Sequence, residues 1–262
     1  MKIVGRVESL WRYPVKSMRG EELPEAFAGF GGVYGDRMFA FHSSAAPKGF
    51  PYLTAREQQQ MLRYQPVYRD ADLMAKPPNL ADVEALAPGL TTVYPSAAQV
   101  VVNVKTPAGE LLAVDDPRLA NDLREGISET HELTLLRSDR ALTDCRPISL
   151  FSIQTARQLS QEVGANLDKR RFRANVYLDI SSQIAFEEEE WVGRMLRVGT
   201  QTTLAVVKRD QRCKMITLDP DTSEANPDII RHLAKQHESK AGVYAAVLVE
   251  GTMRPGDEIA LL

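Results

Sequence analysis

A cysteine lies among basic residues in the second half of the chain. Cys213 is flanked by Arg212 and Lys214, with Arg209 four positions earlier, and it follows a short apolar segment typical of a strand (203–208). Neighbouring positive charge favours the thiolate, which is the form that attacks electrophiles or binds a metal. Soft sulfur ligands suit transition metals better than magnesium or calcium. The alternative interpretation is that Cys213 is a small buried apolar residue, because free cysteine is usually structural.

Further cationic groups occur where predicted strands begin or end. Lys16 follows a strand that stops at Pro14, Arg37 lies in a glycine-rich turn before a strand, and Arg173 opens a strand together with Asn175. Arginine presents a planar fork of donors suited to phosphate and carboxylate, whereas lysine acts as a point charge. If these groups converge on the cysteine, they form a pocket for an anionic ligand with one thiolate inside it. Each basic residue taken alone is equally compatible with a solvated surface charge.

Hydrolase and zinc-helix patterns are poorly supported. His232 and His237 are five positions apart, off the i, i+4 face that zinc-binding helices use. His42 and His131 are isolated, which favours surface or structural roles. The acidic run 187–190 is predicted to be a solvated face or loop. Neither a Gly-x-Ser-x-Gly elbow nor a dinucleotide or phosphate-loop glycine motif occurs at the required spacing.

Length and composition fit an ordinary globular protein of one large or two smaller domains. The chain has 262 residues, 26% charged and 44% hydrophobic, with a net charge of −3 that argues against a general nucleic-acid binder. Two cysteines, Cys145 and Cys213, cannot form a disulfide framework, although one bridge is not excluded. No apolar run approaches the roughly 20 residues that span a bilayer, and the N-terminus lacks a signal-peptide pattern. We therefore expect a cytoplasmic protein without a membrane partner.

Periodicity and turn residues predict many short strands and few helices. Strands are expected at 3–13, 38–41, 100–104, 111–114, 133–136, 173–180, 195–198, 203–208, 243–249 and 258–262. Helices are expected at 54–62, 82–87, 117–125, 152–163 and from 227 to before 242, several with N-cap residues or a glycine stop. This content predicts a β-rich α+β fold, as a barrel or sandwich. Weak candidate boundaries lie at 76–79 and 115–117.

Several short motifs, in order, resemble proteins with a MOSC domain preceded by an N-terminal β-barrel domain, such as the mitochondrial amidoxime-reducing components. The matching segments are Tyr13-Pro14-Val15-Lys16-Ser17, Gly35-Asp36-Arg37, Leu53-Thr54-Ala55-Arg56-Glu57, Phe172-Arg173-Ala174-Asn175, Leu196-Arg197-Val198-Gly199, Arg212-Cys213, Thr217-Leu218-Asp219-Pro220-Asp221-Thr222 and Gly251…Pro255-Gly256-Asp257. Each alone is weak, but their order along nearly the whole chain is specific. The resemblance implies a smaller N-terminal β-barrel-like domain at 1–115 and a MOSC β-barrel domain at 116–262.

The resemblance also implies a molybdenum cofactor (molybdopterin) held between the two domains. Cys213 would be the catalytic residue and the protein ligand of molybdenum. The pterin and its phosphate would be held by Lys16, Ser17, Arg37, Arg173, Asn175 and Arg212. Cys145 matches no ligand position and is expected to be structural.

The implied activity is reduction of N-hydroxylated small molecules by oxygen-atom abstraction, with electrons from a separate donor protein. The alternative is a carrier of molybdenum cofactor or sulfur that turns over no substrate, or a module that kept the fold and lost the cofactor. Two departures bear on the reactivity: Asp210 stands where many relatives have a second cysteine, and Ser223 replaces a usual glycine.

Overall fold

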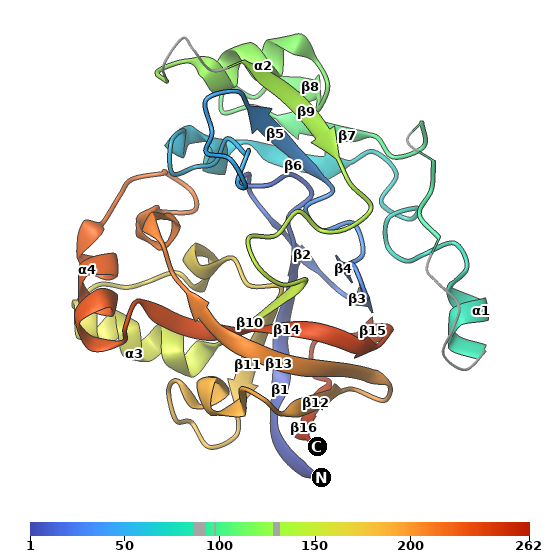
Figure 1. The fold of residues 1–262 in the computed structure, drawn as a ribbon. Coiled ribbons are helices and arrows are strands. Elements are labelled where there is room, and N and C mark those ends of the chain that lie inside the picture. The colour runs from blue at the N-terminus through green and yellow to red at the C-terminus, as the bar shows by residue number, and fades with distance from the viewer. Residues whose placement is uncertain (86–92, 97, 128–131) are drawn as a thin grey trace.

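The strands gather into a barrel and a group of smaller sheets above it. The computed structural model describes residues 1–85, 93–96, 98–127 and 132–262, and Figure 1 shows the barrel in the lower half of the molecule with both termini near its base. The smaller sheets come mostly from the first half of the chain; two of them appear at the top of the same view, and the third lies beside the barrel. The β-rich fold with few helices is therefore confirmed.

Seven of the described strands close into the barrel. In order around it they are β1 (Lys2–Arg12), β11 (Val176–Ile180), β10 (Ile148–Ser152), β14 (Lys240–Val249), β13 (Thr202–Gln211), β12 (Met195–Val198) and β16 (Glu258–Leu261), which pairs again with β1. All neighbours are antiparallel except β10 and β11, which are parallel and joined by helix α3 (Ile153–Val163). The short strand β2 (Glu21–Leu23) pairs with β1 outside the ring. Closure leaves the ring strands no long free edge.

The barrel interior is filled by apolar side chains from all sides of the ring. Leu10, Leu150, Leu178, Val243 and Ile259 are each at most 1% exposed and belong to one cluster. Full burial of such side chains contributes roughly 1.5–3 kcal/mol each. The ring is therefore a packed core, and a ligand site must lie at its end or outside it.

Close packing between the first strand and its neighbour depends on a glycine. A Cβ atom added at Gly5 would lie 2.4 Å from the Asp179 carbonyl oxygen on the facing strand. Only glycine, which has no Cβ atom, allows the backbones of the two strands to come this close. Gly5 thus allows the N-terminal strand to close the barrel.

The upper group comprises two small sheets and one helix, and a third small sheet lies against the barrel. The third sheet consists of β15 (Gly251–Met253), β3 (Ala26–Gly29) and β4 (Gly32–Val33), and its buried side chains Ala26, Ala28, Val33 and Met253 belong to the barrel's hydrophobic cluster. In the upper group, β5 (Phe39–Ser43) pairs with β9 (Leu133–Arg137), and β6 (Gln65–Tyr68), β7 (Val102–Lys105) and β8 (Leu111–Ala113) form the second sheet. Helix α2 (Pro117–Arg124) covers this group, with Asp116 as N-cap. Phe41, Met61, Leu112 and Leu119 share its buried core. The upper group therefore has a hydrophobic core separate from that of the barrel.

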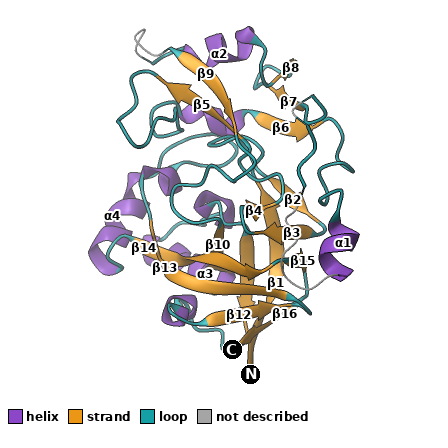
Figure 2. Ribbon diagram, turned by 45° about the vertical axis from the view of Figure 1, so that its right-hand side comes forward, coloured by secondary structure: helices purple, strands orange, loops and turns teal. Residues whose placement is uncertain are grey.

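Two further helices pack against each other on one flank of the barrel, at the left in Figure 1; in Figure 2 one of them, α3, lies partly behind the barrel strands. Helix α3 begins after the N-cap Ser152 and ends at Gly164 in the left-handed conformation, while α4 (Pro227–Gln236) begins after the N-cap Asn226. The short helix α1 (Leu80–Ala85) lies apart from them, on the other side in Figure 1. Among the described residues, no helix is long and apolar enough to cross a bilayer.

Most predicted elements are present, and the predicted helix at 54–62 is wrong. Thr54 and Glu57 do make the expected capping contacts, with the Thr54 amide 3.2 Å from Glu57 Oε2. The chain then leaves helical geometry at Gln58 (φ −115°, ψ 85°), whose buried side-chain amide donates to the carbonyls of Leu123 and Glu125. A short 3-10 helix, η1 (Gln59–Arg63), follows instead.

Two other predictions from the sequence differ from the structure, and two further ones concern residues that the structure does not fully describe. The strand expected from Arg173 begins only at Val176, because Arg173 takes a φ of 51°. The acidic run 187–190 is not a solvated face: it forms the 3-10 helix η3 (Glu187–Trp191), in which Glu188 is fully buried and accepts hydrogen bonds from Ser152 and Thr155. The end of the helix expected at 82–87, and His131, lie outside the described residues.

The two halves of the chain interleave. Strand β1 belongs to the barrel, while α2 and β9, which follow residue 115, pack with the upper group. The domain division between residues 115 and 116 stays a prediction.

Candidate functional site

One cavity collects all seven site residues expected from the sequence. It lies between the barrel end and the upper group, and its lining includes Lys16, Ser17, Arg37, Arg173, Asn175, Arg212 and Cys213. These residues are spread over nearly 200 positions of the chain, from the segment after β1 to the segment after β13. The convergence that the sequence alone could not show is present in the fold.

The cysteine lies at the start of a short turn that is held from both sides. Cys213 precedes the 3-10 helix η4 (Lys214–Thr217) and is half-buried, so its thiol faces the cavity without being sealed. The buried side chain of Ile216 packs against α3 and α4. The Asn226 amide donates to the Thr217 carbonyl at 2.8 Å, which joins the turn to the start of α4. The position of the thiol is therefore set by the packing of α4.

Arg212 is fixed by its neighbours but keeps one donor unused. Its Nε donates to the Ala241 carbonyl at 2.7 Å, its Nη1 donates to the Phe172 carbonyl at 2.8 Å, and Nη1 also lies 2.9 Å from Asp210 Oδ2. Its buried Nη2 has no hydrogen-bond partner among the described residues. Gly242 leaves room for this group, because a Cβ there would lie 3.1 Å from Nη2 and 2.7 Å from the Leu150 carbonyl oxygen.

Two further guanidinium groups lie over one tyrosine ring. The Cζ atoms of Arg37 and Arg173 are 4.5 and 4.3 Å from the centroid of the Tyr13 ring. Asp36 Oδ2 lies 2.5 Å from Arg37 Nη1, and Arg37 Nη2 donates to the Arg173 carbonyl at 3.1 Å. Among the described residues Arg173 has no carboxylate partner, and its buried Nη2 is unpartnered. The cavity wall thus contains one neutralised and one uncompensated guanidinium.

The pKa values of these groups reflect that difference. Burial, reinforced by the Arg37 charge and opposed by Tyr13 and Asp36, lowers the pKa of Arg173 to about 10. Burial also disfavours the Arg37 charge, but Asp36, together with Tyr13 and Asp144, outweighs this effect and raises the pKa of Arg37. A buried cation without a counter-charge is costly, and an anion beside it removes that cost.

Lys16 and Ser17 occupy the turn after β1. The Lys16 ammonium contacts Asp144 and donates to the Leu142 carbonyl at 2.7 Å. Burial lowers the pKa of Lys16, although Asp144 opposes the change. Ser17 is buried in the left-handed conformation, with a φ of 66°. This turn therefore directs a lysine and a serine toward the cavity.

Asn175 lines the cavity but is largely engaged with the protein. Its Oδ1 accepts from the Ser149 amide at 3.2 Å and from the Ser149 hydroxyl at 3.3 Å, and its Nδ2 donates to the Trp11 carbonyl at 3.3 Å. It therefore cross-links β1, β10 and the start of β11. One amide hydrogen remains for a ligand.

The cavity lining also contains basic residues that were not selected from the sequence, namely Arg56, Arg146 and Arg171. With them, basic side chains in the lining outnumber acidic ones: Lys16, Arg37, Arg56, Arg146, Arg171, Arg173 and Arg212 lie there with Asp144 and Asp210. Arg171 is held by the Thr217 carbonyl at 2.9 Å and Asp219 at 2.8 Å, and its buried Nε is unpartnered. Arg56 lies within one of the motifs shared with the family, and Arg171 directly precedes another. These positions were the signal in the sequence that could have identified both residues as part of the site. The arrangement suits a ligand with several negative charges.

Comparison with known proteins agrees with this architecture. The model of the MOSC N-terminal beta barrel domain matches residues 4–123, and the model of the MOSC domain matches residues 137–260. The chain belongs to the MOSC-domain proteins. The suspected resemblance is thereby confirmed.

This MOSC-domain protein is also similar to individual proteins. It is 23% identical to Mitochondrial amidoxime reducing component 2 of Bos taurus in an alignment of 241 residues that covers 84% of this chain and 68% of that one. The YUAD protein of Bacillus subtilis has the same fold, with a TM-score of 0.51 at 12% identity over 100% of this chain and 97% of that one. YiiM of Geobacillus stearothermophilus matches 45% of this chain and 54% of its own, at 20% identity and a TM-score of 0.36.

Proposed function

We propose that this MOSC-domain protein binds a molybdenum cofactor in the cavity, with Cys213 as the protein ligand of the metal. The observation that carries the proposal is the group of unpartnered buried donors, Arg171 Nε, Arg173 Nη2 and Arg212 Nη2, in the lining that also contains the Cys213 thiol. Buried donors of charged side chains are normally paired. Their unused donors fit a phosphate-bearing ligand, and a thiolate fits a transition metal.

The roles of the chain's residues follow from their present contacts. Arg173 and Arg212 would bind the phosphate and pterin oxygens through their unused Nη2 donors, while Arg37 stays paired with Asp36 and positions Arg173 by bonding its carbonyl. Lys16 would contribute a positive charge from the opposite domain, with Ser17 beside it. Asn175 would act chiefly by fixing β1 against β10. Bound cofactor would thus join the barrel to the upper group.

We further propose that the protein is a reductase of N-hydroxylated small molecules, a class that includes the amidoximes for which its Bos taurus relative is named. When bound, the molybdenum cofactor supplies two-electron removal of an oxygen atom from the substrate. The chain's contribution is to hold the cofactor, to present Cys213 to it, and to shield it within a cationic cavity. Electrons would come from a separate donor protein, and we expect a cytoplasmic location.

Turnover by the loaded protein tests the enzyme proposal. Protein made in a cofactor-competent host is assayed with an artificial electron donor and benzamidoxime, beside Cys213→Ala and a control variant, Cys145→Ala. We expect amidine formation by the parent and by Cys145→Ala, and loss of activity in Cys213→Ala. Full turnover by Cys213→Ala would exclude Cys213 as the metal ligand. Stoichiometric transfer of the cofactor to an apo-enzyme, without amidine formation, would show a carrier instead.

A further inference from the structure

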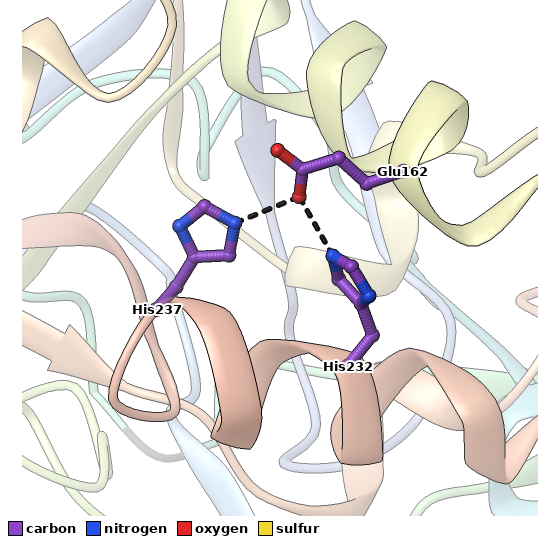
Figure 3. A group of neighbouring side chains, drawn as sticks. All are labelled: Glu162, His232 and His237. Atoms are coloured by element: carbon purple, nitrogen blue, oxygen red, sulfur yellow. Dashed lines mark hydrogen bonds and ion pairs between the residues drawn. The ribbon is translucent and has the colours of Figure 1, made fainter.

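A second cluster of ligand-type side chains lies between α3 and α4, the two helices on the flank of the barrel. Glu162 near the end of α3 faces two histidines, His232 on α4 and His237 just after it (Figure 3). Glu162 Oε2 is 2.9 Å from His232 Nε2 and 2.7 Å from His237 Nε2. The three ligand atoms all lie within 4.8 Å of one another. Both imidazoles therefore turn the same nitrogen toward one carboxylate oxygen.

The end of α4 makes this arrangement possible. Helical geometry stops at His237 (φ −131°, ψ 26°), so the chain bends back and brings His237 beside His232 despite the five-residue spacing. The ring of His237 stacks on Phe186, with ring centroids 4.2 Å apart and planes inclined by 16°. The helix end and the stack fix this imidazole before any ligand is bound.

The carboxylate is oriented by a neighbour one helical turn away. Gln158 Nε2 donates to Glu162 Oε1 at 2.9 Å, which leaves Oε2 for the two histidines. Metal-binding carboxylates and imidazoles are commonly oriented by such outer contacts. The three side chains are half-buried, so water reaches the cluster.

We propose that Glu162, His232 and His237 form a binding site for a divalent transition-metal ion, with Zn²⁺ as the natural occupant. Two imidazole nitrogens and one carboxylate oxygen are ligands that Zn²⁺ accepts, with water in the fourth position. Bond lengths of about 2.0–2.2 Å in a tetrahedron separate ligand atoms by roughly 3.3 Å. The present separations of 2.9 and 2.7 Å need to widen by only a few tenths of an ångström.

The ion would cross-link α3 and α4 beside the cofactor cavity. The loop after His237 contacts the site segment directly, because the Arg212 amide donates to the Ser239 carbonyl at 2.8 Å. The packing of α4 against η4 adds a second connection. Metal binding at the cluster would therefore stabilise the helices that hold the Cys213 turn. This inference does not depend on the function proposed for the cavity.

Zinc alone, titrated into the full chain after chelator treatment and dialysis, tests the site. A Cys145→Ser/Cys213→Ser background removes the thiols, so that any zinc bound is bound elsewhere. Calorimetry should give one Zn²⁺ per chain. At free zinc near 100 times Kd, the melting temperature should rise by about 5–10 °C. In this background Co²⁺ should bind without a sulfur-to-cobalt charge-transfer band.

Near-isosteric variants identify the ligands. Glu162→Gln, His232→Asn and His237→Asn should each weaken zinc binding by more than about 100-fold, and Gln158→Ala by about 10- to 100-fold. The matched control His42→Asn should bind as the parent does. Absence of one-to-one binding in the parent, or binding unchanged by Glu162→Gln and Gln158→Ala, would overturn the proposal. Gln158→Ala removes no ligand, so it remains informative if a ligand variant fails to fold.

Discussion

Replacing Arg173 by methionine should stabilise the cofactor-free protein while weakening its hold on the cofactor. Arg173 is largely buried, has no carboxylate partner among the described residues and has a pKa of about 10, well below the ordinary arginine value. At about 1.4 kcal/mol per pKa unit, this difference corresponds to a destabilisation of roughly 3 kcal/mol. Its contact with the Tyr13 ring offsets about 0.5–2 kcal/mol. Arg173→Met should therefore raise the free energy of unfolding by about 1–2 kcal/mol.

The sign of this effect is fixed by the direction of the pKa change. A base whose pKa is lower in the folded protein binds its proton less tightly there than in the unfolded chain. The resulting destabilisation is fully present at every pH below about 10 and is relieved only as the pH rises from there toward the ordinary pKa of arginine in the unfolded chain. Methionine keeps an unbranched stem and meets the same φ of 51°, so the backbone contribution is unchanged.

Urea unfolding of cofactor-free protein at pH 7 measures the change. Arg231→Met, which alters an arginine whose side chain is 71% exposed, serves as the control and should lie within about 0.5 kcal/mol of the parent. Added pyrophosphate should stabilise the parent and should stabilise Arg173→Met much less. An Arg173→Met variant that is less stable than the parent and is stabilised equally by pyrophosphate would show that the Arg173 charge is neither costly in the free protein nor used for anion binding.

Two further substitutions probe the frame of the site. Gly242→Ala should cost about 3 kcal/mol, because φ is +77° and the new Cβ would lie 2.7 Å from the Leu150 carbonyl oxygen; urea unfolding measures it, and a loss under 1 kcal/mol would contradict the packing described for Arg212. Burial raises the pKa of Glu188 above its ordinary 4.5, despite hydrogen bonds from Ser152 and Thr155. The contribution of this carboxyl to stability is therefore greatest below pH 4.5 and declines as the pH rises through its folded pKa. Glu188→Gln should lose that decline in thermal melts across pH, and Glu188→Ala should cost about 3 kcal/mol by leaving buried donors unpaired; an unchanged pH profile in Glu188→Gln would refute the assignment.

Local signals in the sequence located much of the fold and the site. The N-caps Asp116, Ser152 and Asn226 and the stop at Gly164 act locally, and the helices that they predict are present. The site residues could be selected because arginine, lysine and cysteine at element ends match motifs of a known family. Ser223 shows that a departure from the family pattern need not change the backbone, since it keeps a φ of 66°, in the region that favours glycine.

Long-range contacts explain what the sequence did not predict. The chain leaves helical geometry after Glu57 where Gln58 bonds carbonyls some 65 residues away. Glu188 is buried because Ser152 and Thr155, more than 30 residues earlier, supply its hydrogen bonds. His232 and His237 meet Glu162 because α4 ends between them and packs on α3. Periodicity and spacing carry no information on such partners.

Molybdenum and organic phosphate per chain, measured on protein purified from a cofactor-competent host, report directly on whether the cavity holds a molybdenum cofactor. We expect close to one molybdenum and a pterin phosphate per chain in the parent. Cys213→Ser should lose the metal, and Arg173→Met should lose metal and phosphate together. Parent protein that carries neither, or Cys213→Ser that retains molybdenum fully, would contradict these expectations.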